Sequence, residues 1–449
     1  MIKFRRLHIS FMPDRNLKYK FDNFCYDSFE ILKDQNKFIL HFSVDDKYSF
    51  SPEYEINLDN LSDISQIEYE IFTFGLSEIP SYYKTFCASK IIINAGYLNN
   101  DQILFWQNLF EKGLGEFFYK NQIDFRNLIN ISCNSDRFKD RTLEKNRYEE
   151  IKVLVPIGGG KDSIITGEMM INKGINFSWF SLGDDNTRNN VIKISGNNKV
   201  FSISRDININ FSLIKQLNNE GFPNGHVPIS SVFAFGAVII AKLHGFSYIA
   251  ISQEKSANIG NVEYLNTNIN HQYSKSYEAE LAIHNYINTY ISKDINYFSA
   301  LRNLNEIQIS KLFSQYSKYF NSFISCNKTQ NQSVWCGNCA KCAFTYLILS
   351  PFINRNILID IFKKDLLNDP ELLSLYRELA GDEKIKPFDC VGTFEEVSLA
   401  FYLTYEKYLK EDLEIPFILK NIDVKKGEKN LNLLTEINSE HIIPEFLLT

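Results

Sequence analysis

Hydrophobic residues in the central part of the chain alternate between short continuous runs and longer runs with helical periodicity. An apolar, β-branched run at Val153–Ile157 predicts a buried strand, and a glycine turn and a helical segment at Ile164–Ile171 follow it. Further strands are predicted at 176–182, 199–203 and 248–251, and helices near 164–173, 211–220 and 231–244 separate them. This alternation is typical of a doubly wound parallel sheet, so we predict an α/β fold.

The first third of the chain has a different pattern. Alternating aromatic and polar residues up to about residue 66, as in Phe38–Ser43, predict a small antiparallel β region. Apolar residues at helical spacing predict a helix over 102–118, and a charged run at 137–150 predicts an exposed linker or helix face. We therefore predict an N-terminal α+β domain over 1–148, a domain with the parallel sheet over 149–350, and a helical region over 351–449.

Three consecutive glycines link the strand at Val153–Ile157 to its helix. They continue into Lys-Asp-Ser, so the whole stretch is Gly158, Gly159, Gly160, Lys161, Asp162 and Ser163. A glycine turn that opens a helix is a standard anion site, because the backbone can approach closely and free N–H groups face the anion. Two common phosphate loops are excluded. The P-loop needs Ser or Thr where Asp162 stands, and the dinucleotide fingerprint needs glycine at Ser163.

What remains resembles the PP-loop of ATP pyrophosphatases, whose pattern is Ser-Gly-Gly-x-Asp-Ser. Gly158 stands at the position of the first serine, which removes one hydroxyl contact to pyrophosphate. The resemblance implies that Gly158–Ser163 bind ATP in a fold of the PP-loop (adenine nucleotide alpha hydrolase-like) type. Because ligands of such sheets lie beyond the carboxyl ends of the strands, the segments 183–188 and 252–258 are further site candidates.

Composition and charge indicate which classes of partner and which cellular compartment to expect. The 449 residues are enough for more than one core, and the net charge of −6 argues against a nucleic-acid-binding protein, which would usually be basic. The longest apolar run, 232–241, is too short to cross a bilayer and predicts a buried helix. The first residues are basic but have no apolar stretch behind them. We therefore expect no signal peptide, no membrane contact and a cytoplasmic protein.

Half of the eight cysteines are close together in sequence: Cys326, Cys336, Cys339 and Cys342. Two Cys-x2-Cys steps and a cysteine ten residues upstream can supply four thiolates to a tetrahedral Zn²⁺. The spacing also suits an iron–sulfur cluster, but zinc is preferred because nothing else in the chain indicates electron transfer. With all four positions taken, the zinc would be structural. The arrangement resembles the zinc site of 7-cyano-7-deazaguanine synthases, which are also PP-loop enzymes.

Several motifs stand in order along the chain and together resemble the UDP-N-acetylmuramoyl-L-alanyl-L-glutamate epimerases. Besides the glycine loop and Trp335–Phe344, they are 224–228, 254–261, 270–276 and 386–392. The resemblance extends from 113–119 to about residue 400. It implies an isomerase that uses ATP to invert the terminal L-Glu of a UDP-sugar dipeptide to D-Glu. It also implies release of AMP and pyrophosphate and a role in peptidoglycan synthesis, and thus in cell shape.

The low acidity of the glutamate α-proton explains why such an inversion would need ATP. A carboxylate makes its own α-proton hard to remove, because the enolate would carry two negative charges. Adenylation with ATP removes the first charge and gives a carbonyl that can delocalise the second. A PP-loop suits this step, because its N–H groups and Lys161 can hold pyrophosphate while Asp162 helps to hold Mg²⁺.

The sequence does not single out the base that takes the α-proton. The candidates are His226, Glu254, Lys255, His271, Lys275 and Cys390, of which His271 and Lys275 are four residues apart and could share a helix face. Two other enzyme classes stay open: a PP-loop enzyme that modifies a 7-deazaguanine or tRNA, and a ligase that forms an amide from an adenylated acid. A module that senses ATP without turnover is the non-enzymatic alternative.

Overall fold

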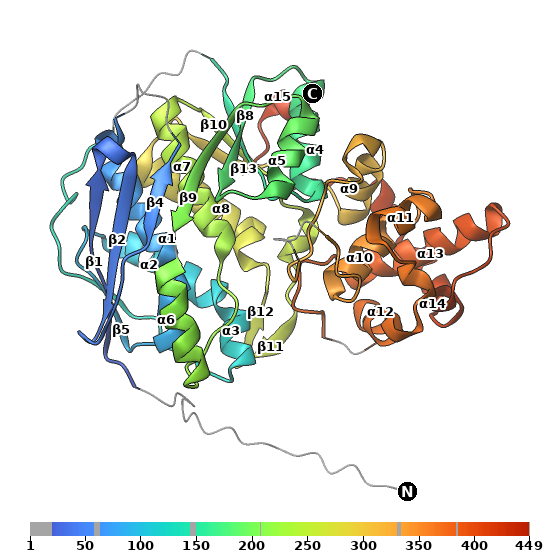
Figure 1. The fold of residues 1–449 in the computed structure, drawn as a ribbon, viewed down its shortest axis with the longest axis horizontal. Helices are drawn as coiled ribbons and strands as arrows, with labels where there is room; N and C mark the ends of the chain where they lie inside the picture. Colours follow the sequence, from blue (N-terminus) through green and yellow to red (C-terminus); the bar gives the residue numbers. More distant parts are fainter. Residues whose placement is uncertain are drawn as a thin grey trace, which may run out of the picture.

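The computed structural model describes residues 20–57, 63–143, 150–206, 208–329, 334–382 and 385–448. These residues form two lobes that lie side by side (Figure 1). The sheet lobe comprises residues 20–313 and the C-terminal segment 435–448, and it contains the described strands and helices α1–α8 and α15, while α9 lies at its boundary beside the helices of the other lobe (Figure 1). The helical lobe comprises residues 334–434 and contains α10–α14.

One large sheet runs through the sheet lobe. Within the described part of the chain it has eleven strands in the order β13-β10-β7-β8-β9-β4-β2-β1-β5-β6, with β3 paired to β2, while β11 and β12 form a separate hairpin. The strands are β1 (Asn23–Leu32), β2 (Lys37–Val44), β3 (Tyr48–Phe50), β4 (Glu53–Ile56), β5 (Lys90–Ile93), β6 (Ile131–Cys133), β7 (Val153–Pro156), β8 (Phe177–Leu182), β9 (Val200–Asp206), β10 (Tyr248–Ile251), β11 (Val262–Tyr264), β12 (Thr267–Ile269) and β13 (Asn296–Ser299).

The centre of the predicted fold is the parallel part of this sheet. Strands β13, β10, β7, β8 and β9 are parallel to one another. From β7 the chain adds β8 and β9 on one side and later adds β10 and β13 on the other. The turn after β7 therefore lies at a switch point, where such sheets bind ligands. The prediction of an α/β fold with parallel strands at its centre is confirmed.

The predicted antiparallel region is present, but it belongs to the same sheet. Antiparallel pairs join β1 to β2, β2 to β3 and β4, and β4 to β9, with Tyr54 opposite Arg205. Beyond β1, the strands β5 and β6 continue the sheet in parallel. The sheet is therefore mixed. The predicted domain boundary at 148/149 lies in the stretch 144–149, outside the described residues, and stays a prediction.

Helices cover both faces of the parallel strands. Leu154 of β7 joins the core that contains α7, whereas Val153 and Val155 join the core beside α4. Gly167 lets α4 approach β8, because a Cβ at this glycine would lie 2.1 Å from the Trp179 ring. The helices are α1 (Glu68–Phe86), α2 (Asn100–Gly113), α3 (Gly115–Lys120), α4 (Lys161–Asn172), α5 (Asn186–Ser195), α6 (Asn208–Asn219), α7 (Ile229–His244), α8 (Tyr277–Tyr286), α9 (Glu306–Phe313), α10 (Ala340–Leu349), α11 (Arg355–Phe362), α12 (Leu373–Leu379), α13 (Phe394–Lys410), α14 (Phe417–Lys420) and α15 (Glu445–Leu448).

The apolar run at 232–241 forms the centre of α7 and is buried except at Phe233, as the sequence predicts. Several elements were not predicted, among them α5 and β13. α5 contains few apolar residues, and Asp185 begins it by accepting hydrogen bonds from the N–H groups of Thr187 and Arg188. The edge strand β13 is only four residues long. Among the described helices, none combines the length and apolarity that crossing a membrane requires.

The chain passes between the lobes at two places. It leaves the sheet lobe after α9 and returns after a 3-10 helix, η10 (Val424–Leu434), which packs along α13. On its return the Asn438 N–H donates to the carbonyl of Asn303 at 3.0 Å, and Phe446 packs edge-on against Tyr248 with ring centres 5.0 Å apart. The C-terminal helix α15 thus lies against the sheet lobe (Figure 1).

Candidate functional site

The glycine turn opens α4, as predicted. Gly160 is the N-cap residue of α4 and no side chain caps its first turn, so capping does not use the N–H groups there. Gly159 has a φ of +84°, which favours glycine. A Cβ at Gly158 would meet no atom within 4 Å, so the serine of the PP-loop pattern would fit there. These features suit an anion site, and binding of ATP by Gly158–Ser163 stays a prediction.

A cluster of three carboxylates lies at the start of α4. Asp162 meets Glu254, which follows β10, and Glu306, which begins α9; their oxygen atoms lie within 4.8 Å of one another. The ammonium of Lys161 contacts both Asp162 and Glu306. Burial raises the pKa of Glu306 to about 7, and the charges of Asp162 and Glu254 add to this effect against that of Lys161. A group of carboxylate oxygens that already holds one cation has the chemistry that Mg²⁺ requires.

A second group of ionisable side chains surrounds the Cys390 thiol. Lys275 Nζ donates a hydrogen bond to Cys390 Sγ at 3.3 Å, and His271 Nε2 lies 3.8 Å from the same sulfur. His271 Nδ1 contacts the carboxylate of Glu116. The charge of Lys275 also acts on Asp162, so this group adjoins the carboxylate cluster. In such a chain of contacts, from thiol to imidazole to carboxylate, the imidazole favours ionisation of the thiol and the carboxylate orients the imidazole.

The charges in this group favour an ion pair between thiolate and imidazolium. Burial raises the pKa of Cys390, but the cations of Lys275 and His271 outweigh this effect and lower the pKa to about 6. Burial lowers the pKa of His271, but its contacts with Cys390 and Glu116 outweigh this effect and raise the pKa to about 9. Burial and the positive charge of His271 together lower the pKa of His226 to about 3, so this neighbouring ring is neutral. The two cations therefore favour the ionised form of the thiol.

The segment that carries Cys390 is held from both lobes. Lys341 of α10 contacts the carbonyl oxygen of Cys390. The Asn261 side chain donates to the carbonyls of Lys386 and Pro387, at 3.2 and 2.8 Å, and accepts from the backbone N–H of His271 at 2.8 Å. One asparagine thus fixes the thiol-bearing segment relative to the imidazole.

A fully buried arginine holds two of the candidate residues in place. The Arg302 guanidinium pairs with Glu280 at 2.7 Å and donates to the carbonyls of Glu254 and Lys275, at 2.6 and 2.7 Å. It therefore joins the loop after β10 to the 3-10 turn η4 (Tyr273–Lys275). His271 precedes this turn, so it does not share an α-helix with Lys275.

The structure brings most of the candidate bases together. Cys390, His271 and Lys275 are in contact, Glu254 lies in the adjoining cluster, and the His226 ring centre is 4.4 Å from that of His271. Lys255 lies apart, because its ammonium pairs with Glu436 at 2.6 Å where both side chains are partly exposed. Sequence reasoning missed Glu116, Glu306, Lys341 and Lys386. Glu116, Lys341 and Lys386 lie within motifs that carry the family resemblance, at 113–119, 335–344 and 386–392, whereas Glu306 lies in none of them.

The four clustered cysteines can hold a metal. All are free thiols, and their sulfur atoms lie within 4.8 Å of one another. The Sγ–Sγ distances are 3.9 Å for Cys326–Cys339, 3.6 Å for Cys336–Cys342 and 3.5 Å for Cys339–Cys342. Four thiolates at zinc–sulfur distances of about 2.3 Å lie about 3.8 Å apart, so the geometry fits a single tetrahedral ion. A cluster of several irons would need wider spacing between these sulfurs.

Replacing Cys339 with serine is expected to remove about one equivalent of metal and to lower the thermal stability, because a structural metal contributes to folding. Elemental analysis and thermal unfolding of the purified protein measure both effects. Cys25→Ser is the matched control, since Cys25 lies in β1 and is only half-buried. Wild-type protein that is stable without zinc or iron would contradict the metal site.

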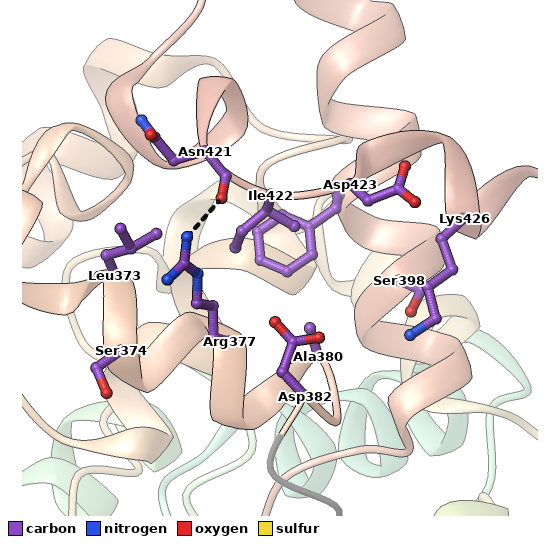
Figure 2. Close-up of a pocket in the computed structure, with 11 residues that line it drawn as sticks. Leu373, Ser374, Arg377, Ala380, Asp382, Ser398, Asn421, Ile422, Asp423 and Lys426 are labelled. Carbon is purple, nitrogen blue, oxygen red and sulfur yellow. Dashed lines mark hydrogen bonds between the residues drawn. The ribbon is translucent and has the colours of Figure 1, made fainter. Parts of the chain in front are cut away.

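A pocket of about 620 Å³ lies in the helical lobe between α12, α13 and residues 421–426 (Figure 2). Figure 2 shows Arg377 directed at the backbone of Asn421, where it donates to the carbonyl at 3.4 Å. The other charged residues that line it are Asp382, Asp423 and Lys426. None of the predicted site residues lines this pocket, so we do not place the reaction there.

Known proteins resemble this chain over both lobes. The family model of the MurL N-terminal domain matches residues 15–300, and that of the MurL C-terminal domain matches residues 322–427. A UDP-N-acetyl-alpha-D-muramoyl-L-alanyl-L-glutamate epimerase of Xanthomonas oryzae pv. oryzae is 29% identical over 376 residues, which is 82% of each chain. A Micromonospora protein of the same name is 31% identical over 331 residues, 73% of this chain and 72% of the relative.

These matches confirm the resemblance found in the sequence, and they cover the residues that meet at the lobe boundary except Glu306, which lies between the two matched ranges. The N-terminal match includes Asp162, Glu254, His271 and Lys275, and the C-terminal match includes the four cysteines and Cys390. The chain belongs to the MurL family.

Proposed function

We propose that this chain inverts the terminal L-glutamate of UDP-N-acetylmuramoyl-L-alanyl-L-glutamate to D-glutamate, as an isomerase of peptidoglycan biosynthesis. The family and the names of the relatives support this substrate. The observation that carries the proposal is the Cys390 thiol held between Lys275 and His271, because inversion needs a proton-transfer group that is ionised near neutral pH. Nucleotide-linked sugars and ATP belong to the cytoplasm, where we place the reaction.

ATP is the proposed co-substrate. A glutamate carboxylate oxygen attacks the α-phosphorus of ATP, and pyrophosphate leaves. The resulting acyl adenylate has a far more acidic α-proton than the carboxylate, because its enolate carries one negative charge less. After inversion, water cleaves the acyl–phosphate bond and releases AMP. The uncapped start of α4, beside the carboxylates, supports this step.

The proposed nucleotide site is formed by Gly158–Ser163 and the first turn of α4. The carboxylates of Asp162, Glu254 and Glu306 would hold Mg²⁺, which when bound neutralises phosphate charge. Lys161 balances part of the negative charge of these carboxylates. The four cysteines lie in a separate group, and we propose that they hold a structural Zn²⁺.

Cys390 is the proposed base. Its thiolate takes the α-proton of the activated glutamate, while Lys275 and His271 keep the sulfur ionised until the proton arrives. Glu116 holds His271 through Nδ1 and thereby turns Nε2 toward the sulfur. Inversion is complete when a proton reaches the opposite face of the α-carbon.

Turnover in D₂O tests the proposal. With ATP and Mg²⁺ present, the product is expected to carry deuterium at the glutamate α-position, and without ATP neither exchange nor inversion is expected. Mass spectrometry of the recovered dipeptide, with a chiral assay of its glutamate, measures both. Exchange that proceeds equally well without ATP would contradict the acyl adenylate.

The same reaction mixture separates the other enzyme classes. A ligase would release AMP only when an amine acceptor is added, and a PP-loop enzyme of 7-deazaguanine or tRNA modification would release AMP with those substrates and not with the UDP-dipeptide. A sensing module would bind ATP without releasing AMP in any mixture.

A further inference from the structure

The loop between α12 and α13 carries a buried lysine that the proposed mechanism has not used. Lys386 is 3% exposed, and within the described part of the chain its Nζ makes no hydrogen bond. An ammonium has three N–H donors, and burying them without acceptors costs free energy. Such a group is retained where a ligand supplies the missing acceptor.

The other lysines of the centre differ from Lys386, because each has an acceptor. Lys161 contacts two carboxylates, Lys275 donates to Cys390 Sγ, and Lys341 contacts the Cys390 carbonyl. Among these described lysines, Lys386 is the one whose ammonium has no hydrogen-bond acceptor, so an acceptor on the substrate could bind to it.

Lys386 belongs to the segment that Asn261 holds beside His271, next to the reaction centre. The charges that act on Lys386 are those of Glu396, Glu254, Cys390 and Glu306, which oppose the lowering of its pKa by burial. Its own carbonyl accepts a hydrogen bond from Asn261 at 3.2 Å, so the backbone is fixed while the ammonium stays unpaired. Lys386 and Cys390 stand four residues apart on the same loop, so the segment that carries the thiol also carries this ammonium.

We propose that Lys386 is a catalytic residue that donates a hydrogen bond to the acyl oxygen of the activated glutamate and stabilises the enolate. This inference rests on the proposed function. The acceptor that the ammonium lacks would be the oxygen on which negative charge develops, and a preorganised donor in a buried site is an effective stabiliser of such charge.

The step balances without another reactant. The Cys390 thiolate forms an S–H bond with the α-proton, the electron pair of the C–H bond becomes the C=C bond, and the carbonyl π pair moves to the acyl oxygen. Lys386 stays protonated and its hydrogen bond to that oxygen strengthens. When the α-carbon takes a proton of solvent origin on the opposite face, the electron pairs return and the carbonyl forms again, and the Cys390 thiol then releases its proton to solvent.

Lys386→Met tests the inference in the full-length protein. Substrate-dependent exchange of labelled pyrophosphate into ATP reports adenylation, and deuterium in the recovered dipeptide reports enolate formation. The variant is expected to keep pyrophosphate exchange and to lose α-deuteration by about 100-fold or more. Its thermal midpoint is expected to be unchanged or higher, because methionine removes an unpaired buried cation.

Lys407→Met is the matched control. Lys407 of α13 is half-buried, but its ammonium donates to the carbonyls of Ser350 and Ile353, at 3.0 and 2.7 Å. Losing these bonds is expected to lower the thermal midpoint and to leave both exchange reactions unchanged. The two lysine variants should therefore show opposite patterns.

Each remaining outcome overturns the inference. If Lys386→Met loses both pyrophosphate exchange and α-deuteration, the ammonium binds the nucleotide or the ground-state carboxylate. If the thermal midpoint falls as well, the role of Lys386 is structural. Deuteration of the L-substrate without inversion would make Lys386 a proton donor to the second face. If wild-type protein releases no AMP with the UDP-dipeptide, the proposed function itself fails, whatever the variants do.

Discussion

Replacing Cys390 with alanine is expected to lower inversion and α-deuteration by about 1,000-fold, within the range that general acid–base catalysis contributes. The thiol is the point at which Lys275 and His271 converge, and no other thiol lies within hydrogen-bonding distance of either among the described residues. Pyrophosphate exchange into ATP is expected to continue, because adenylation does not need the thiolate. Deuterium in the recovered dipeptide measures the loss.

Cys133→Ala is the control for this variant. Cys133 is a half-buried thiol in β6 that donates to the carbonyl of Gly96 at 3.2 Å, far along the sheet from β7. The acid limb of the wild-type pH profile is a second check: deuteration should fall as the pH drops below about 6, where the Cys390 thiolate becomes protonated. Deuteration by Cys390→Ala at the wild-type rate would assign the base elsewhere.

Asp162→Asn is expected to reduce pyrophosphate exchange by about 100-fold or more, and α-deuteration with it, because the step that activates the glutamate is lost. The substitution removes one of three carboxylates proposed to hold Mg²⁺ and one of the two partners of Lys161. Since Glu306 still pairs with Lys161, the fold should persist. The parallel loss of both reactions distinguishes this variant from Cys390→Ala, which separates them.

Asp136→Asn is the matched control, because it removes an aspartate from an exposed Asp–Lys pair, with Lys139 at 2.8 Å. Both exchange reactions should keep their wild-type rates in this variant. If Asp162→Asn releases AMP at the wild-type rate, the glycine loop is not part of the nucleotide site.

Local patterns were enough to predict the strands β7, β8, β9 and β10, the glycine turn and the cysteine cluster. Each depends on residues that are near one another in sequence, such as the three glycines before α4 or Cys336, Cys339 and Cys342. The mixed character of the sheet did not follow from such patterns. The β4–β9 pair joins residues about 150 positions apart, and no local periodicity reports which strands become neighbours.

The same limit applies to the reaction centre. Glu116 meets His271 across 155 positions, and Lys161 meets Glu306 across 145. In sequence Lys255 and Lys275 were equally good candidates, yet Lys275 is half-buried and donates to the thiol, whereas Lys255 pairs with the partly exposed Glu436. Only the packing of the elements that carry them separates the two lysines.

The two crossings of the chain between the lobes, after α9 and after η10, limit how the lobes can move. Bodies joined by one flexible link can turn about three axes, whereas two links leave mainly the axis through both of them. Cys390 is held from both lobes, by Lys341 of α10 and through the Asn261 contacts beside His271. Separating the lobes would therefore break one of these holds, and it would draw the thiol away from His271 and Lys275 only if the Asn261 contacts break. Without these cations the thiol would regain its proton. Opening of the two lobes is therefore coupled to protonation of Cys390 through the contacts of Asn261.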